Sequence, residues 1–325
     1  MSPDRAVRIL SLVAGWLMKR MLWFVLVCLG NVLMADAKDP QEFDKLWNYS
    51  DPAATEGKFR TLLPEAESVG DLEYHLQLLT QLARTQSLQG KFAEAHAILD
   101  RVEKQLGPNT PVAEVRYLLE RGRTFNSAKK TDEASRLFLR AFELGEQRRL
   151  DFYAIDAAHM VAIAEQDPAK QMEWNLKGVA LAESSKDERA NNWLGSLYNN
   201  IGWTYHDAGN YGDALPMFRK ALAFREQKGE GGSIRTAKWC VGRCLRSLNR
   251  NDEAMKIQRE LEGEYEKLAM KDGYVFEEIA ELLALQKDAE AKRYFRLAHE
   301  ELSKDDWLKQ SEAKRLERLR ELGGE

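Results

Sequence analysis

The chain has 325 residues, of which 44% are hydrophobic and 31% are charged, and 48 Lys and Arg residues nearly balance 52 Asp and Glu residues. The formal net charge of -4 gives no overall field that would favour nucleic acid, and the charged fraction excludes a protein with many membrane spans. Leucine, alanine, glutamate, lysine and arginine dominate, and alternating runs of β-branched residues are almost absent, which predicts helices throughout.

The N-terminal segment has the features of an export signal. Lys19 and Arg20 precede an apolar run over residues 21–34, and the run ends in Ala35-Asp36-Ala37. A basic segment, about 7–15 apolar residues and small residues before the cleavage point describe a secretory signal peptide. We therefore expect residues 1–37 to be removed after Ala37, and the protein to be periplasmic or at the cell surface. The alternative is an uncleaved anchor, although each apolar run is shorter than the roughly 20 residues of a spanning helix.

Two residues of this segment leave details open. Met18 is followed by a basic and then an apolar stretch (MKRMLWF), so the protein starts at Met1 or at Met18. Cys28 lacks the context of a lipoprotein cysteine, because Val27 precedes it and the apolar run continues beyond it.

Internal repeats organise the rest of the chain. Four segments align, and each has an alanine at the same place: GKFAEAHAILDRV (90–102), KKTDEASRLFLRA (129–141), GNYGDALPMFRKA (209–221) and NRNDEAMKIQREL (249–261). Weaker copies align on Gln171 and Ala291. The anchor positions are therefore 95, 134, 171, 214, 254 and 291, which lie 37 to 43 residues apart.

The residues before the anchors repeat as well. The best copy reads Tyr198-x-x-Ile201-Gly202-x-x-Tyr205, followed by Ala214, Phe218 and Ala221. This copy resembles the tetratricopeptide repeat, W-x-x-L-G-x-x-Y…A-x-x-x-F, with tyrosine in the tryptophan position. The resemblance covers about residues 72–303, with one full and five partial copies. The family spacing of about 34 residues is exceeded in every copy, which implies longer helices or longer connections.

The repeat predicts how each unit packs. Small residues such as Gly202 and Ala214 let two helices cross closely, and Tyr205 and Phe218 fill the space beside the crossing. A helical hairpin of this kind cannot cover its own apolar faces, so neighbouring hairpins stack. The resemblance therefore implies an all-α, right-handed superhelical solenoid of about six hairpins with helical caps.

The domain boundaries follow from this pattern. We expect a signal peptide at 1–37, an N-terminal helical cap or degenerate repeat at 38–71, the repeat array at 72–303 and a C-terminal capping helix at 304–325. Asp51-Pro52 is a good helix start, because an acceptor at the N-cap precedes a proline at the first helical position. Pro64 should bend or end the cap's second helix, and Gly323-Gly324 should stop the last helix.

Signs of catalysis are absent from the sequence. It contains no G-x-S-x-G, H-E-x-x-H or phosphate-binding G-x-x-x-x-G-K-[ST] motif. The five histidines are spread along the chain without metal-ligand spacing. Cys240 and Cys244, one turn apart, are better interpreted as small buried residues than as half of a metal site. We expect no enzymatic activity, no cofactor and no metal.

The resemblance also implies a binding face. In the family, the fifth, ninth and twelfth positions of each hairpin's first helix line a concave groove. From these positions we select a candidate peptide-binding set: Arg84, Arg123, His159, Asn199, Trp203, His206, Trp239, Arg243 and Arg246. Glu277 and Glu281 would make the C-terminal end of the groove acidic. Such residues point away from the helix crossings, so we expect them to be dispensable for folding. The alternative is that these faces are ordinary solvated surface.

The function implied is that of a non-catalytic scaffold or adaptor. It would hold an extended segment of another protein, and not nucleic acid, in its groove, and it would have no membrane span after signal cleavage. The alternative is a peptide-responsive sensor or regulatory module of an envelope complex. The sequence does not identify the partner.

Overall fold

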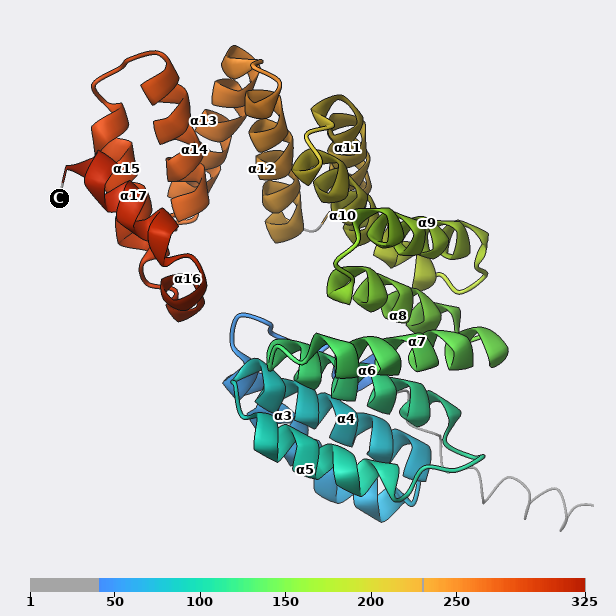
Figure 1. The fold of residues 1–325 in the computed structure, drawn as a ribbon. Helices are drawn as coiled ribbons and strands as arrows, with labels where there is room; N and C mark the ends of the chain where they lie inside the picture. The colour runs from blue at the N-terminus through green and yellow to red at the C-terminus, as the bar shows by residue number, and fades with distance from the viewer. Residues whose placement is uncertain (1–40, 230, 325) are drawn as a thin grey trace, which may run out of the picture. The chain divides into compact units, whose positions relative to one another are not determined.

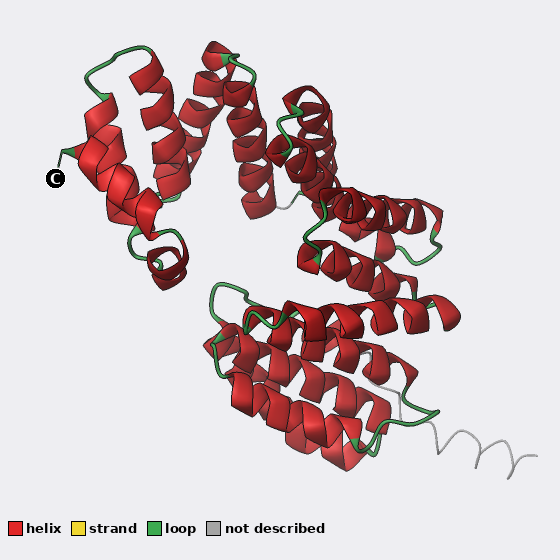
Figure 2. Ribbon diagram, viewed as in Figure 1, coloured by secondary structure: helices red, strands yellow, loops and turns green. Residues whose placement is uncertain are grey.

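The computed structural model describes residues 41–229 and 231–324, and these residues are helical apart from short connections (Figure 1 and Figure 2). No strand occurs among them. The helices form two compact units, one extending to Lys130 and the other comprising Thr131–Glu325. The predicted all-α fold of tetratricopeptide-like hairpins with helical caps is confirmed. The predicted signal peptide and its cleavage point lie outside the described residues.

The first unit contains five described helices. They are α2 (Gln41–Asp44), α3 (Pro52–Val69), α4 (Leu72–Leu88), α5 (Phe92–Glu103) and α6 (Pro111–Ser127). Helix α4 packs against α3, α5 and α6 and is the centre of this unit. Phe43 and Phe59, which are fully buried, meet edge to face with ring centroids 6.1 Å apart and join the N-terminal segment to the core.

The N-terminal cap differs in part from its prediction. Asp51 caps α3 as expected, because its Oδ1 accepts a hydrogen bond of 2.9 Å from the Ala54 amide and Pro52 occupies the first turn. The expected pair of helices is a single turn, α2, followed by one long helix. Pro64 lies inside α3 and does not end it. The ring of Pro64 lies on the exposed face of the helix, so it costs a backbone hydrogen bond without disturbing the buried face.

The second unit is a series of helical hairpins. Its helices are α7 (Thr131–Gln147), α8 (Asp151–Ala164), α9 (Pro168–Ser184), α10 (Leu194–Asp207), α11 (Tyr211–Lys228), α12 (Gly231–Ser247), α13 (Asn251–Lys267), α14 (Gly273–Leu285), α15 (Ala291–Leu302), α16 (Asp306–Ser311) and α17 (Ala313–Gly323), with the 3-10 turn η1 (Ala190–Trp193) before α10. Each helix from α7 to α15 packs against the next one along the chain. The predicted single capping helix is in fact two, α16 and α17, and α17 packs against α15 and ends at Gly324, whose φ is 79°.

The repeat register is confirmed by burial. The five alanine anchors lie in the second helices and are buried: Ala95, Ala134, Ala214, Ala254 and Ala291. The longest anchor spacing, between Gln171 and Ala214, is explained by the inserted turn η1. Gly202 lies at a helix crossing, because a Cβ atom there would be 2.6 Å from Cε1 of Phe218. The small residue is therefore required by the approach of α10 to α11.

Candidate functional site

The predicted binding residues lie on the first helices of their hairpins. Arg84 is on α4, Arg123 on α6 and His159 on α8, while Asn199, Trp203 and His206 are on α10 and Trp239, Arg243 and Arg246 are on α12. The structure brings the members from α10 and α12 together in the second unit, and it joins Arg84 and Arg123 in the first unit through a shared partner. His159 instead pairs with a residue that the prediction did not include.

Three partly exposed aromatic rings form a continuous row in the second unit. Trp203 of α10 and Trp239 of α12 have ring centroids 6.0 Å apart, and Trp239 and Tyr274 of α14 have centroids 5.8 Å apart. The indole Nε1 of Trp239 donates a hydrogen bond of 3.2 Å to the Tyr274 carbonyl oxygen. We call Trp203, Trp239 and Tyr274 the aromatic row. It crosses three successive hairpins, so it follows the direction in which an extended segment would lie.

The arginines beside the row are not free. Glu278 of α14 is only 3% exposed, and it accepts two hydrogen bonds of 2.7 and 2.9 Å from Arg246 and lies 3.2 Å from Nε of Arg243. Burial alone would lower the pKa of Arg246, but the hydrogen bonds and negative charge of Glu278 outweigh it and raise that pKa. A buried carboxylate shared by two guanidiniums leaves one net positive charge at this position.

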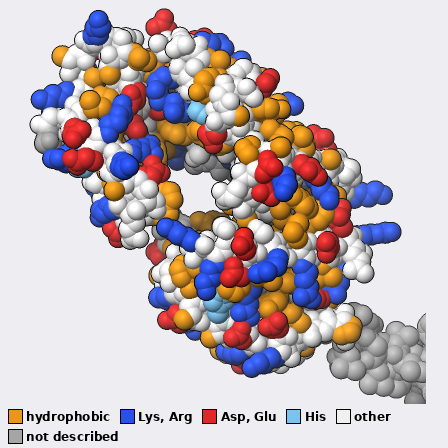
Figure 3. Space-filling model, in the orientation of Figure 1, with side chains coloured by type: hydrophobic (Ala, Val, Ile, Leu, Met, Phe, Trp, Pro, Cys, Tyr) orange, Lys and Arg blue, Asp and Glu red, His pale blue; other side chains and the backbone are white. Residues whose placement is uncertain are grey.

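The acidic end of the predicted groove is also neutralised. Glu277 of α14 accepts hydrogen bonds of 3.0 and 3.1 Å from Nε of Arg315, and Glu281 pairs with Arg318, both arginines belonging to the capping helix α17. The Arg315 guanidinium lies 5.2 Å from the Tyr274 ring centroid, at the end of the aromatic row. The expectation of an acidic end is therefore wrong, because arginines of the capping helix pair with both of its partly desolvated glutamates. On the face that Figure 3 shows, basic and acidic side chains are likewise interspersed.

His206 and Trp203 contribute to packing as well. His206 is 7% exposed, its Nε2 is 2.9 Å from Oγ of Ser247 on α12, and its ring lies 4.9 Å from that of Tyr211. Burial, together with the nearby charge of Arg243, lowers its pKa. The Trp203 ring packs edge to face on Phe218 at 5.2 Å. The expectation that groove residues are dispensable for folding is thus wrong for these two residues, because their rings fill space between helices.

In the first unit the same kind of pairing recurs. Glu120 of α6, 3% exposed, lies 3.3 Å from Arg84 and 2.8 Å from Arg123. The guanidinium of Arg84 is also 5.5 Å from the ring centroid of Trp47 and 5.3 Å from that of Tyr49, and these two rings stack at 4.8 Å. The segment before α3 therefore covers Arg84 from outside.

One register position, missed by sequence reasoning, supplies the partners of the predicted residues. It is the residue directly after the fifth position of each first helix: Gln81, Glu120, Asp156, Asn200, Cys240 and Glu278. Within each unit these side chains contact groove positions of the preceding first helix. Glu120 contacts Arg84, Asn200 lies 3.1 Å from Nδ1 of His159, and the Cys240 thiol donates to Oδ1 of Asn199 at 3.4 Å. A polar residue at one fixed position in five of the six first helices was the available signal.

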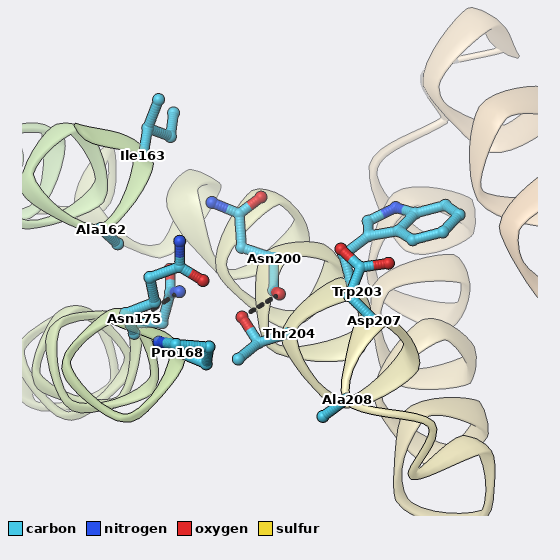
Figure 4. A pocket seen from close by; sticks show the side chains of 10 residues that line it. Ala162, Ile163, Pro168, Asn175, Asn200, Trp203, Thr204, Asp207 and Ala208 are labelled. Atoms are coloured by element: carbon cyan, nitrogen blue, oxygen red, sulfur yellow. Dashed lines mark hydrogen bonds between the residues drawn. The ribbon is translucent and has the colours of Figure 1, made fainter. Parts of the chain in front are cut away.

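A pocket of about 330 Å³ opens between α9 and α10, and Trp203 of the aromatic row is among its lining residues (Figure 4). Helix α9 contributes Gln171 and Asn175, α10 contributes Asn200 and Thr204, and the end of α8 contributes Ile163. In Figure 4 the ring of Trp203 lies on the far side of α10 from Asn175. A second pocket, of about 450 Å³, lies between α13, α14 and α15.

Comparison with known proteins identifies one repeat. A model of the tetratricopeptide repeat matches residues 194–228, which span α10 and α11. This part of the chain is the copy that the sequence pattern matches best. No curated protein sequence matches the chain.

Solved structures of similar fold extend the likeness to most of the chain. The apo form of RapI has a TM-score of 0.60 and 15% identity, over 82% of this chain and 77% of that one. NprR in complex with its cognate peptide NprX has a TM-score of 0.55 and 15% identity, over 86% and 82%. A signal transduction ATPase with a tetratricopeptide repeat sensor, from Pyrococcus horikoshii, has a TM-score of 0.61 and 13% identity, over 85% of this chain and 42% of that one. At these identities the likeness concerns the fold.

The described residues include two cysteines, both in α12. Cys240 and Cys244 are buried and unpaired with each other, as predicted, and burial raises the pKa of each thiol to about 11. Within residues 41–229 and 231–324, no three His, Cys, Asp or Glu side chains are grouped so that they could hold a metal ion. No helix in those ranges is long and apolar enough to cross a membrane.

Proposed function

We propose that this protein is a non-catalytic scaffold that binds an extended segment of another protein along the aromatic row of the second unit. The observation that carries the proposal is the row itself. Three partly exposed rings on the first helices of three successive hairpins are continuous at 6.0 and 5.8 Å. Arg315 lies over the Tyr274 ring, and Arg243 and Arg246 follow Trp239 on α12. Aromatic and arginine side chains are the residue types that most often dominate the affinity of a protein interface.

The paired charges refine what the segment would be. Arg243 and Arg246 share Glu278, and Arg315 pairs with Glu277. All three arginines therefore already have a carboxylate partner inside the protein. We therefore propose that the row contributes flat apolar contacts, and that the Arg–Glu pairs contribute hydrogen bonds to the main chain of the segment. Support from other proteins is limited to fold: NprR was crystallised with its cognate peptide, and a Rap protein with the competence and sporulation factor.

The location belongs to the proposal as well. Residues 1–37 have the pattern of a secretory signal peptide, and we propose that the mature protein acts in the bacterial periplasm or at the cell surface. N-terminal sequencing of protein recovered from the exported fraction should begin at or near Lys38. An intact N-terminus in the membrane fraction would favour the anchored alternative.

A capture experiment tests the binding function. The wild-type chain and two variants, Trp239→Ala and Trp307→Ala, would be used as baits in the exported fraction, with quantitative mass spectrometry of the captured proteins. Trp307 is 59% exposed on α16 and lies outside the row, so it is the matched control. A true partner is retained by wild type and Trp307→Ala and is depleted at least about tenfold with Trp239→Ala, since an aromatic anchor is worth about 2 kcal/mol. Equal capture by all three baits would refute the row as the binding face, provided that circular dichroism shows each bait folded.

A sensor function is the second candidate, and one observation favours it. Glu278 links α14 to α12 through both arginines, so a ligand that competes for Arg246 would change a contact between neighbouring hairpins. A bound segment that alters hydrogen exchange in α13 and α15, which do not carry the row, would support this candidate over a passive scaffold.

A further inference from the structure

The pocket between α9 and α10 adjoins the aromatic row at Trp203 and has polar walls that the row lacks. It has a volume of about 330 Å³, and its polar walls are formed by Gln171 and Asn175 of α9 and by Asn200, Thr204 and Asp207 of α10. We call it the α9–α10 pocket (Figure 4). Ligand pockets in proteins start at about 300 Å³, so this one suits a small group such as the end of one side chain.

Asn175 is the most informative residue in the pocket. It is 2% exposed, and its Nδ2 donates a hydrogen bond of 2.9 Å to the carbonyl oxygen of Gln171. Because a carbonyl oxygen can only accept, this bond fixes the orientation of the Asn175 amide. Its Oδ1 is then left buried and without a hydrogen-bond partner. An unsatisfied buried acceptor costs about 1–3 kcal/mol, a cost that a ligand donor would remove.

The polar side chains around Asn175 each make a hydrogen bond inside the protein. The Gln171 amide donates to the Glu165 carbonyl oxygen at 2.7 Å, the Thr204 hydroxyl donates to the Asn200 carbonyl oxygen at 3.0 Å, and the Asn200 Nδ2 lies 3.1 Å from Nδ1 of His159. Each of these amides keeps a second N–H group, so the lining contains both donors and acceptors. Oδ1 of Asn175 is the lining atom that is buried without a partner, and it favours a ligand that donates.

The charge of the pocket points the same way. Asp207, with a side chain that is 76% exposed, is its only ionisable lining residue, and among the described residues no Lys or Arg lines it. The nearest recorded partner of Asp207 is His206, at 3.6 Å. A negative group at the edge and a buried acceptor inside disfavour a carboxylate or phosphate and favour a cation.

We propose that the α9–α10 pocket binds the cationic end of an arginine or lysine side chain, which would donate to Oδ1 of Asn175 and face the carboxylate of Asp207. The proposal rests on the proposed function in one respect, namely that the side chain belongs to the bound segment. It adds a specificity that the row alone does not give, because flat aromatic contacts do not select a charge.

Matched peptides test the proposal. The probes are acetyl-Gly-Gly-Arg-Gly-Gly-amide and the same peptide with citrulline or glutamate in place of arginine, titrated into the ¹⁵N-labelled full chain. Citrulline keeps the shape of arginine and removes the charge. We expect the arginine peptide to shift the side-chain amide resonances of Asn175 and Asn200 and to bind at least about tenfold more tightly than the other two, because hydrogen bonds to charged groups exceed neutral ones. Equal affinity for arginine and citrulline would overturn the proposal.

Three variants locate the binding. Asn175→Asp, which is nearly isosteric, should bind the arginine peptide more tightly than wild type. Asn175→Leu should bind it about tenfold more weakly. Asp207→Asn should weaken it less, since the side chain is largely exposed, whereas Asp213→Asn, an exposed acid on α11 outside the pocket, should have no effect. Arginine affinity that is unchanged in both Asn175 variants would refute the assignment.

A small-molecule probe and the Trp239→Ala variant separate this proposal from the proposed function. Methylguanidinium chloride, titrated in place of a peptide, should shift the Asn175 resonance in wild type and in Trp239→Ala alike. If it does while no partner depends on Trp239, the pocket stands and the row fails. If capture depends on Trp239 but the Asn175 resonance moves with neither methylguanidinium nor the arginine peptide, the row stands and the pocket proposal is refuted.

Discussion

Both units contain two arginines that share one buried glutamate, but the two arrangements are covered differently. In the first unit Glu120 joins Arg84 and Arg123, and the stacked rings of Trp47 and Tyr49 lie over Arg84. In the second unit Glu278 joins Arg243 and Arg246, and no ring in the described part of that unit covers Arg243 in this way.

The position of the aromatic rings explains the difference. In the first unit the rings come from the segment before α3, so the chain itself occupies the face of its arginine pair. In the second unit the rings are part of the repeat helices and form a row beside the pair. The first unit thus shows an Arg–Glu–Arg arrangement covered by rings of its own chain, and the second shows the same arrangement with its rings alongside.

The largest effect should come from Gly202→Leu, which disrupts the helix packing that positions Trp203 in the second unit. A Cβ atom alone would lie 2.6 Å from Phe218, so a leucine forces α10 away from α11 and displaces Trp203. We expect a loss of about 3 kcal/mol in the free energy of unfolding, at the upper end of the overpacking range. Urea denaturation followed by circular dichroism would measure it. The control is Gly212→Leu on α11, where no atom lies within 4 Å of the added Cβ; equal losses in both variants would contradict the crossing.

The next effect compares the two glutamates directly. Glu278→Gln and Glu120→Gln each leave two arginines without their shared negative charge. We expect each to lose about 2 kcal/mol, less than for fully buried pairs, because the arginines are partly open to water. Only Glu278→Gln should also reduce capture of the partner. Reduced capture by Glu120→Gln as well would show that the first unit is not closed by its own chain.

A smaller effect should follow from opening the first unit. Tyr49→Ser removes one of the rings that lie over Arg84, at a cost of about 1 kcal/mol for the lost stacking and cation–π contacts. Arg84 should then react faster with phenylglyoxal, as followed by peptide mass spectrometry. Arg243 in the same sample is the internal reference. An unchanged rate for Arg84 would mean that Tyr49 does not protect it.

The smallest effect concerns pH and His206. Its pKa in the folded protein lies below the ordinary value of 6.5, so the unfolded chain takes up a proton first as the pH falls. Stability should therefore decrease as the pH falls through about 6.5 and level off below the folded-state pKa. His206→Gln should flatten this part of the curve of Tm against pH. His75→Gln should leave the contribution of His206 to that curve unchanged. His75 also has a pKa lowered by burial, but it lies in the first unit. A wild-type slope in His206→Gln would contradict the assignment.

The fold could be predicted from the sequence because the small residues at its helix crossings recur at regular spacing. Ala214 and Gly202 occupy crossings where backbones approach, and such a position tolerates few residue types, so its spacing remains visible in weaker copies. The helix starting at Asp51-Pro52 was predictable for a local reason, since its cap involves only neighbouring residues.

The site could be predicted only in part, because the repeat register gives the position of a residue on its helix but not the side chains that it contacts. Arg246 was placed correctly on α12, but its partner Glu278 is one residue beyond the predicted Glu277, and one residue along a helix turns the side chain by about 100°. The covering of Arg84 by Trp47 and Tyr49 involves residues before the repeats, which no register argument reaches. The proposed ligand preference of the α9–α10 pocket depends on the hydrogen bond of Asn175, which only the three-dimensional structure shows.

The two buried thiols give the protein a built-in reporter of local opening. Cys240 and Cys244 pack in the same cluster as Ala214, Phe218 and Val241, and with a pKa of about 11 neither is a thiolate at neutral pH. A thiol reagent can therefore reach them only when α11, α12 or α13 separates. The labelling rate of the native chain measures how often the fourth and fifth hairpins come apart, without any introduced probe. A segment bound along the row would be detected as a slower rate, before its identity or its affinity is known.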